Sequence, residues 1–92
     1  MIVSFRNSET EAIARGARVK RFEAIERVLM RKLQQLEVAG HLGDLSIPPG
    51  NRLQALKGQR SGQYSIRVND QYRVCFVWRD GDAFDVEIVD YH

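Results

Sequence analysis

The sequence predicts a small α+β domain, with two N-terminal helices packed on one face of a mainly antiparallel β-sheet. Over residues 19–39 an apolar residue recurs every three or four positions, which is typical of one buried helix face. Over residues 64–68, 72–78 and 84–89 apolar and polar residues alternate, which indicates half-buried strands. Because 92 residues bury enough surface for one core and not for two, we expect a single domain over residues 1–92.

The first part of the chain predicts a strand followed by two helices. Residues 1–6 are apolar at positions 2, 3 and 5 and indicate a short opening strand. Ser8 and Glu11 have the spacing of a capping box, so we expect Ser8 to cap a short helix that ends near Gly16. The second helix covers residues 19–39. Its apolar stripe consists of Phe22, Ile25, Leu29, Leu33 and Leu36.

The second part predicts a loop and then an antiparallel meander. Residues 48–51 read Pro-Pro-Gly-Asn, and two consecutive prolines cannot join a helix or a sheet ladder, so a loop is expected there. The first strand of the meander is expected over residues 53–57. The three alternating segments follow it, separated by turn signals at residues 69–71 and 80–82.

Residue parity predicts how these strands pair. The apolar residues that define the last three strands are even-numbered, and a slip of one residue would move all of them to the other face. A shared buried face therefore requires three-residue turns at 69–71 and 80–82. In that register Arg67 lies opposite Arg73, and Arg73 lies opposite Val89.

The same register gathers polar side chains on the face of the sheet that points away from the core. Tyr91 becomes a diagonal neighbour of Arg73, with Arg67 and His92 nearby, and Lys57 is odd-numbered and can join them. Two arginines opposite each other repel, so a face that tolerates them is often built to hold an anion. Alternatively, each arginine lies along apolar surface with its charged head in water.

Charge is divided unevenly along the chain. Residues 1–60 carry 11 Lys and Arg against 6 Asp and Glu, whereas residues 61–92 carry 3 against 6. Part of the basic excess forms a stripe on the second helix, made of Lys20, Arg27 and Arg31. This distribution is compatible with a nucleic acid partner and also with an ordinary solvated surface.

Several classes of protein are excluded. The longest apolar run is the five residues from Val74 to Trp78, far short of the about 18 that a membrane helix needs, and no signal-peptide core follows Met1. The single cysteine, Cys75, excludes an internal disulfide framework and a cysteine-built zinc site, and its apolar strand indicates an inert thiol. The acids around residues 80–87 lack the spacing of a calcium loop. We therefore expect a soluble, cytoplasmic protein with no metal site and no cofactor.

The polar face is suited to cleavage of RNA by its own 2′-hydroxyl group. That reaction needs a group that accepts the 2′-hydroxyl proton, another that protonates the leaving 5′-oxygen, and positive charge around the phosphorus. Arginine supplies the charge through a planar fork of donors. His92 exchanges protons near neutral pH, and Tyr91 is a second candidate if neighbouring cations stabilise its phenolate. A Tyr-His tail without a catalytic role is the alternative.

Three stretches are distinctive when taken together. They are residues 46–58 (Ser-Ile-Pro-Pro-Gly-Asn-Arg-Leu-Gln-Ala-Leu-Lys-Gly), residues 62–74 (Gly-Gln-Tyr-Ser-Ile-Arg-Val-Asn-Asp-Gln-Tyr-Arg-Val) and residues 86–92 (Val-Glu-Ile-Val-Asp-Tyr-His). With the opening five residues, they resemble the HigB-type toxins of the RelE superfamily over essentially the whole chain. The resemblance implies a RelE-like fold of two helices and a sheet. It also implies an mRNA interferase that enters the ribosomal A site and cuts mRNA there without a metal.

The resemblance implies roles for particular residues. The catalytic set would be Lys57, Arg73, Tyr91 and His92, with Asp90 in support. Gln54 stands where some family members carry histidine, and its amide can hydrogen-bond RNA but cannot exchange protons near neutral pH. Candidate contacts to mRNA or rRNA are Arg67, Lys20, Arg27 and Arg31.

The resemblance also implies partners. A cognate helix-turn-helix antitoxin would neutralise the toxin, and DNA would be met only through the toxin–antitoxin complex that represses its own operon. The ribosome and mRNA are the other expected partners, and no membrane is involved. Two further functions stay open, because fold alone does not settle function. Relatives with this fold block DNA gyrase but lack the terminal Tyr-His, and a non-catalytic protein would act only as a co-repressor.

Overall fold

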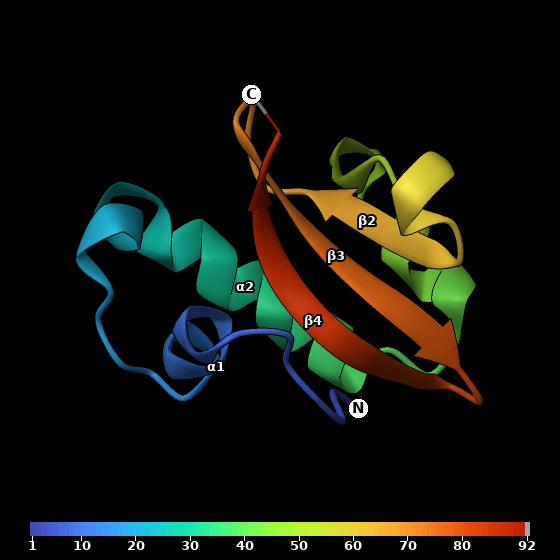
Figure 1. Ribbon diagram of the computed structural model, residues 1–92, viewed down its shortest axis with the longest axis horizontal. Helices are drawn as coiled ribbons and strands as arrows, with labels where there is room; N and C mark the ends of the chain where they lie inside the picture. The colour runs from blue at the N-terminus through green and yellow to red at the C-terminus, as the bar shows by residue number, and fades with distance from the viewer. Residues whose placement is uncertain (92) are drawn as a thin grey trace.

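Two α-helices and a four-stranded sheet form the fold in the computed structural model, which describes residues 1–91 (Figure 1). The helices are α1 (Ser8–Ala14) and α2 (Glu26–Val38). The strands are β1 (Gln54–Ala55), β2 (Gln63–Arg67), β3 (Tyr72–Arg79) and β4 (Asp82–Asp90), and they lie side by side in that order. Every neighbouring pair is antiparallel. The predicted α+β class is therefore confirmed.

Helix α1 begins one residue earlier than the predicted cap implies. The side-chain oxygen of Asn7 accepts a hydrogen bond from the backbone N–H of Thr10, at 2.9 Å. Asn7 has the extended backbone of an N-cap residue, whereas Ser8 is already helical. The prediction that Ser8 caps this helix is therefore wrong, because an asparagine one position earlier satisfies the first-turn N–H groups instead.

The predicted helix over residues 19–39 is divided into two segments. A 3₁₀ segment, η1 (Lys20–Ile25), precedes α2, and Ile25 departs from helical geometry with φ −119° and ψ 10°. The apolar stripe continues across the break, because Phe22 is buried and packs edge-on against Tyr72 with 5.4 Å between ring centroids. The apolar stripe thus predicted correctly which side of this segment is buried, but it did not predict the break at Ile25.

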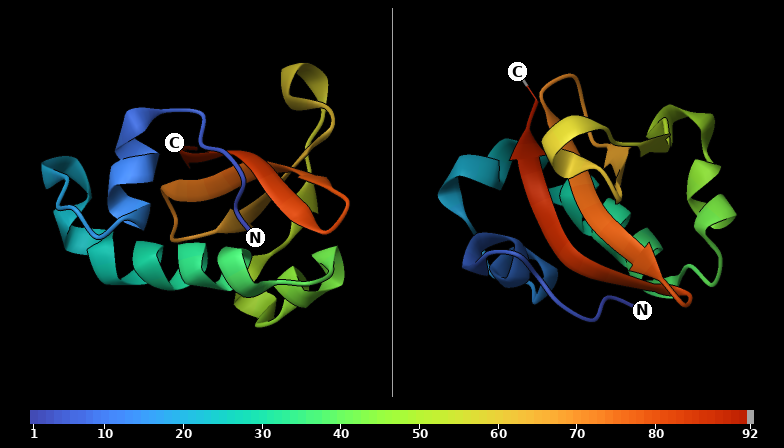
Figure 2. Two further views of the ribbon diagram at one scale, coloured as in Figure 1. Left: turned by 90° about the horizontal axis from the view of Figure 1, so that it is seen from below. Right: turned by 45° about the vertical axis from the view of Figure 1, so that its right-hand side comes forward.

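The core lies between α2 and one face of the sheet (Figures 1 and 2). Helix α2 runs along that face, and α1 packs beside it near β4, where Thr10 Oγ1 accepts a hydrogen bond from the backbone N–H of Ile88 at 3.1 Å. The fully buried members of this core include Ile13, Phe22, Leu29, Leu36, Ile66, Val74, Phe76 and Val86. The helices thus share one apolar core with the sheet, as the sequence predicts.

The hairpin between β2 and β3 has the predicted register. Arg67 pairs with Arg73, and the N–H of Val68 donates to the carbonyl of Tyr72 at 3.0 Å, which leaves a three-residue turn over residues 69–71. The side-chain oxygen of Asn69 closes this turn by accepting hydrogen bonds from the backbone N–H groups of Gln71 and Tyr72. The prediction of a three-residue turn here is confirmed.

The hairpin between β3 and β4 reaches the predicted pairing by a different route. Arg79 pairs with Asp82, so the turn has two residues, Asp80 and Gly81, both with positive φ as a type I′ turn requires. A bulge then adds one residue to β4 at Asp85, whose φ is +54°. The prediction of a three-residue turn at 80–82 is wrong, but the bulge restores the expected register beyond it.

The bulge changes which residue of β4 enters the core. Before it, Val77 pairs with Phe84 and Trp78 pairs with Ala83, so the fully buried residue is Ala83. Phe84 was expected on the buried face and instead lies half-buried on the other one. There the guanidinium of Arg79 sits 4.5 Å above its ring. After the bulge, Arg73 pairs with Val89 as predicted.

The opening segment lies beside β4 and runs parallel to it. Ile2 bridges to Ala83 and Phe5 bridges to Val86, with a hydrogen bond of 2.8 Å from the Val3 N–H to the Ala83 carbonyl. The two bridges are isolated, and the bulge at Asp85 lies between the two residues of β4 that they join. The predicted opening strand is therefore an extended segment with broken pairing. Within residues 1–91, no helix has both the length and the apolar character that a membrane crossing requires.

Candidate active site

Arg73 lies on the face of the sheet that points away from α2, as predicted. Its Nε donates to the hydroxyl oxygen of Ser65 at 2.7 Å, and its Nη2 donates to the backbone carbonyl of Arg52 at 2.7 Å. Partial burial lowers the pKa of the Arg73 guanidinium. Cys75 and Tyr91 oppose this shift, and the positive charges of Arg67 and Arg52 add to it. An arginine stays charged despite such a shift, so Arg73 is a permanent cation with a fixed orientation.

Tyr91 is the diagonal neighbour of Arg73 that the register predicts. The guanidinium carbon of Arg73 is 6.0 Å from the centroid of the Tyr91 ring. The backbone N–H of Tyr91 donates to the carbonyl of Gln71 at 2.7 Å, which holds the residue beside the β2–β3 turn. Tyr91 is 45% exposed, and it forms part of the wall of the cavity described next.

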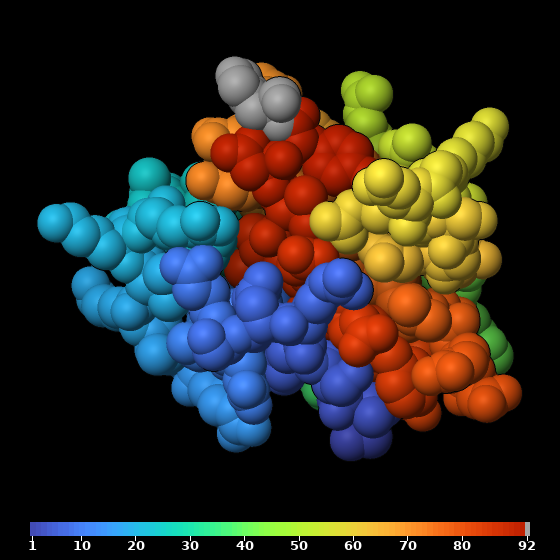
Figure 3. Space-filling view, in the orientation of Figure 1, coloured from blue at the N-terminus to red at the C-terminus, as the bar shows by residue number. Residues whose placement is uncertain are grey.

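A cavity of about 380 Å³ opens at this end of the sheet. Its walls are formed by Arg52, Arg67, Asn69, Asp70, Arg73 and Tyr91. Three of these six side chains are guanidinium groups, and a carboxylate is present only on Asp70, which forms an ion pair with Arg67. Figure 3 shows the end of β4 (red) beside the surface of the segment around residue 60 (yellow) on this face of the molecule. The excess of positive charge makes the cavity suited to an anion such as a phosphodiester.

The other predicted catalytic residues are Asp90, Lys57 and His92, and none of the described ones is part of the cavity wall. Asp90 ends β4, and its Oδ2 accepts a hydrogen bond from the side-chain amide of Gln71 at 3.0 Å. Lys57 is exposed at the start of the 3₁₀ segment η4 (Gly58–Arg60) and is not among the described residues that form the cavity wall. His92 lies outside the described residues.

The strand expected over residues 53–57 is much shorter than predicted. Only Gln54 and Ala55 pair with β2, because Arg52 adopts a left-handed backbone (φ 46°, ψ 54°) and Lys57 begins η4. Gln54 is exposed and pairs with Ser65, the residue that accepts from Arg73. Gln54 is therefore two strands away from Arg73 on the same face of the sheet.

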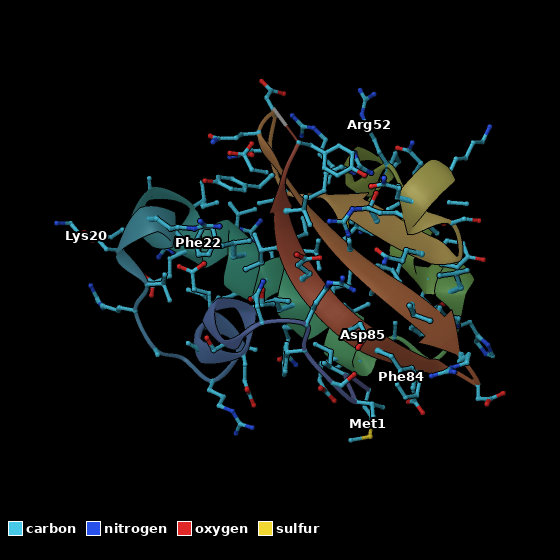
Figure 4. The ribbon with its side chains drawn as sticks, viewed as in Figure 1. Met1, Lys20, Phe22, Arg52, Phe84 and Asp85 are labelled. Atoms are coloured by element: carbon cyan, nitrogen blue, oxygen red, sulfur yellow. The ribbon has the colours of Figure 1, made fainter. Side chains whose placement is uncertain are left out.

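The residues of the predicted basic stripe are not among those that line the cavity. Lys20, Arg27 and Arg31 are all exposed. In Figure 4 Lys20 lies at the left edge of the molecule, away from Arg52, a residue of the cavity wall, at the top. A further cation on α2, which was not predicted as part of the site, is Lys32. Burial lowers the pKa of the Lys32 ammonium, and the positive charges of Arg31 and Arg67 lower it further.

Arg52, Asn51 and Ser65 are site residues that the sequence analysis missed. Asn51 follows Pro-Pro-Gly and resembles an ordinary turn residue, yet its side chain is fully buried. Its Nδ2 donates to the Leu45 carbonyl and to Gln35 Oε1, both at 3.0 Å, while Lys32 donates to its Oδ1. The sequence contains no signal for this burial, because the partners come from α2 and from the 3₁₀ segment η2 (Leu42–Ser46). The 3₁₀ turn η3 (Pro49–Asn51), found where a loop was predicted, ends at Asn51.

Replacing Asn51 with alanine should destabilise the protein by about 2–4 kcal/mol, because it leaves the Lys32 ammonium and a buried carbonyl without their partner. The free energy of unfolding in urea is the measurement. Asn7→Ala is the matched control, since it removes an asparagine that only caps a helix and should cost about 1 kcal/mol. Equal losses in the two variants would contradict the role assigned to Asn51.

Cys75 is fully buried beside this site, opposite Ser65 in the β2–β3 pairing. Burial raises the pKa of its thiol, so the neutral form is favoured, in agreement with the predicted inert thiol. Within residues 1–91, His, Cys, Asp and Glu side chains form no cluster of three or more that is placed to hold a metal ion.

The fold and the site together define a small basic α+β protein with an arginine-lined cavity next to a tyrosine at the end of its sheet. The chain belongs to the HigB-like toxin family, because the family model described as "RelE-like toxin of type II toxin-antitoxin system HigB" matches residues 14–92. The resemblance seen in the sequence is thereby confirmed.

Two relatives have informative names. The chain is 52% identical to "Toxin HigB-1" of Vibrio cholerae over 62 residues, and this matched region covers 67% of this chain and 65% of that protein. It is 36% identical to "Endoribonuclease HigB" of Proteus vulgaris over 61 residues, and this matched region covers 66% of this chain and 65% of that protein. The similarity therefore spans just under two thirds of the length of each relative.

Solved structures with the same fold include toxins of another group. The structure matches the YoeB–YefM toxin–antitoxin complex of Staphylococcus aureus with a TM-score of 0.58 at 18% identity, covering all of this chain and 98% of that one. It matches the YoeB dimer of the same organism with a TM-score of 0.56 at 18% identity, covering 99% and 94%. At this level of identity the comparison shows the fold alone, and it agrees with the α+β architecture described above.

Proposed function

We propose that this protein is the toxin of a type II toxin–antitoxin pair and that it cuts mRNA in the ribosomal A site. The observation that carries the proposal is the cavity in which Arg73, held by two hydrogen bonds, lies over the exposed ring of Tyr91. Family membership and the name of the Proteus vulgaris relative support an endoribonuclease activity.

The proposed chemistry is attack of the RNA 2′-hydroxyl on the adjacent phosphorus. The 2′-oxygen forms a new P–O bond as its proton passes to a base. The bond to the 5′-oxygen then breaks as that oxygen takes up a proton, which leaves a 2′,3′-cyclic phosphate and a 5′-hydroxyl end. Tyr91 and His92 are the proposed proton-transfer groups. Arg73 and Lys57 are proposed to stabilise the extra negative charge on the phosphorane, and Asp90 to support its neighbour Tyr91. This reaction requires no cofactor.

The cations around the cavity are proposed to make the main contacts to the RNA. Arg67 is half-buried and forms part of the cavity wall, so a phosphate there would compete with Asp70 for its guanidinium. The exposed Lys20, Arg27 and Arg31 are proposed to contact rRNA further away, and Gln54 to hydrogen-bond the mRNA. The remaining proposed partner is a helix-turn-helix antitoxin, through which alone the toxin would meet DNA. The cytoplasm is the proposed location, because mRNA is translated there.

A purified translation reaction tests this function. Protein, active ribosomes and a defined mRNA are incubated together, and the 5′ ends of the mRNA are mapped. We expect cuts at the codon in the A site, and no cuts when ribosomes are omitted. Intact mRNA after prolonged incubation with translating ribosomes would overturn the proposal, and inhibition of DNA gyrase in a parallel assay would then favour a non-catalytic toxin.

A further inference from the structure

We propose that Ser65 is a positioning residue that, together with the Arg52 carbonyl, holds the Arg73 guanidinium in the orientation needed to bind the scissile phosphate. This inference rests on the proposed function, because the role given to Ser65 is to orient a residue of the proposed active site. Ser65 does not touch the RNA in this proposal. It acts only through Arg73.

The hydrogen bonds of Arg73 use one edge of its guanidinium group. Nε donates to Ser65 Oγ and Nη2 donates to the Arg52 carbonyl, both at 2.7 Å, with a longer contact of 3.5 Å from Nη2 to the Ser65 carbonyl. Nη1 forms no hydrogen bond with any residue that the structure describes. Because the guanidinium is planar, fixing Nε and Nη2 also fixes the direction of both Nη1 N–H groups. The free edge of Arg73 is thus pre-oriented, and Arg73 is part of the cavity wall.

Ser65 is held more rigidly than a surface serine. It lies in the middle of the sheet, paired with Gln54 of β1 on one side and with Cys75 of β3 on the other, and it is 0% exposed. A hydroxyl group buried in a sheet is costly unless it forms a hydrogen bond, and the partner of this one is Arg73. A fixed strand therefore presents a fixed acceptor to Arg73.

The second acceptor is held by a different part of the chain. The left-handed backbone of Arg52 directs its carbonyl to Arg73. The residue before it, Asn51, is locked in place by hydrogen bonds to Gln35 and to the Leu45 carbonyl. Arg73 is consequently held between a central strand and a loop that α2 supports. Movement of either acceptor alone would be opposed by the other.

Such an arrangement should affect the chemical step more than binding. An arginine without these two acceptors samples several rotamers, and it still attracts a phosphate by its charge. Stabilisation of the phosphorane requires donors already aimed at the oxygens where charge develops. Loss of the Ser65 hydroxyl should therefore lower kcat and change KM little.

The test compares Ser65→Ala with Ser46→Ala. Both variants remove a serine hydroxyl that forms one 2.7 Å hydrogen bond, but Ser46 is exposed and lies outside the cavity, where it donates to the Gly43 carbonyl. Ribosome-dependent cleavage is measured for both. We expect Ser65→Ala to lose about tenfold to a hundredfold in kcat, the loss typical of one hydrogen bond to a charged group, with KM within about threefold. Ser46→Ala should match the wild-type protein, and Ser65→Thr should recover most of the rate because it keeps the hydroxyl group.

A second readout does not depend on catalysis. The NMR signal of the Arg73 Nε–H reports whether this group is hydrogen-bonded, and we expect its exchange with water to be slow in the wild type and in Ser46→Ala but fast in Ser65→Ala. Slow exchange in folded Ser65→Ala, or a kcat within twofold of the wild type, would overturn the positioning role. The wild-type protein could fail to cleave mRNA while the Arg73 Nε–H still exchanges fast in Ser65→Ala. In that case the proposed function fails, and the anchoring of Arg73 by Ser65 stands.

Discussion

Replacement of Arg73 by alanine should reduce ribosome-dependent mRNA cleavage by about a hundredfold to a thousandfold, the loss typical of one preorganised donor to a developing negative charge. Arg73 is the cation of the cavity whose orientation is fixed by two hydrogen bonds of 2.7 Å, and it lies directly beside Tyr91. The rate is measured as the initial velocity of A-site cleavage in the purified translation reaction. We expect the larger effect on kcat, because a transition-state interaction is lost.

The fold should survive this substitution. Arg73 points away from the apolar core, so its removal leaves the α2–sheet packing intact, and we expect a loss of no more than about 2 kcal/mol in the free energy of unfolding. A larger loss would mean that the side chain has a structural role. Arg79→Ala is the matched control, because Arg79 is on the same strand and contacts Phe84 outside the cavity. Arg79→Ala should cleave at the wild-type rate.

A lysine at position 73 separates charge from geometry. Arg73→Lys keeps the positive charge, but a single ammonium group cannot reproduce the planar fork that reaches both Ser65 and the Arg52 carbonyl. We expect cleavage between that of the wild type and that of Arg73→Ala. Cleavage by Arg73→Lys at the wild-type rate would show that charge alone suffices and would contradict the importance of orientation.

Replacement of Tyr91 by phenylalanine should reduce cleavage by about a hundredfold or more, which is the typical contribution of a proton-transfer group. The substitution removes only the hydroxyl group. The ring that lies 6.0 Å from the Arg73 guanidinium and the backbone hydrogen bond to Gln71 both remain. RNA binding should therefore change little, and the loss should be in the chemical step. The measurement is the single-turnover rate with saturating ribosomes.

Tyr64→Phe is the control for this substitution. Tyr64 is a tyrosine of strand β2, and its ring stacks on Phe76 with 6.3 Å between centroids. Loss of its hydroxyl group should leave cleavage unchanged, because this even-numbered residue faces the core side of the sheet. A full rate in Tyr91→Phe would instead transfer the role of proton exchange to other groups and would remove Tyr91 from the proposed catalytic set.

The periodicity of the sequence determined the fold class, the buried stripe of α2 and the face of the sheet on which Arg73 and Tyr91 meet. Periodicity suffices for these features because they depend on the alternation of neighbouring residues along one element. The three-residue turn at 69–71 fixed the pairing of Arg67 with Arg73, and Asn69 closes that turn with local hydrogen bonds. The pairing of Arg67 with Arg73 was therefore predictable from positions close together in the chain.

Errors arose where two different local structures satisfy the same sequence pattern. At the β3–β4 hairpin a two-residue turn and a bulge at Asp85 take the place of one longer turn. Both solutions satisfy the parity of the core residues near Arg73, so the pattern could not distinguish them, and Phe84 was assigned to the wrong face. The same holds for the cap of α1, where Asn7 and Ser8 are both good capping residues.

Only the tertiary structure decided how the site is held. Ser65 and the Arg52 carbonyl reach Arg73 from separate segments, and the partners of Asn51 lie 16 residues away at Gln35 and 19 residues away at Lys32. Contacts between distant segments depend on how the elements pack, which no local pattern encodes. The alternation of residues along the chain thus determined that Arg67, Arg73 and Tyr91 face outward. The packing of α2 and its following loop against the sheet determined that Arg73 is fixed in place.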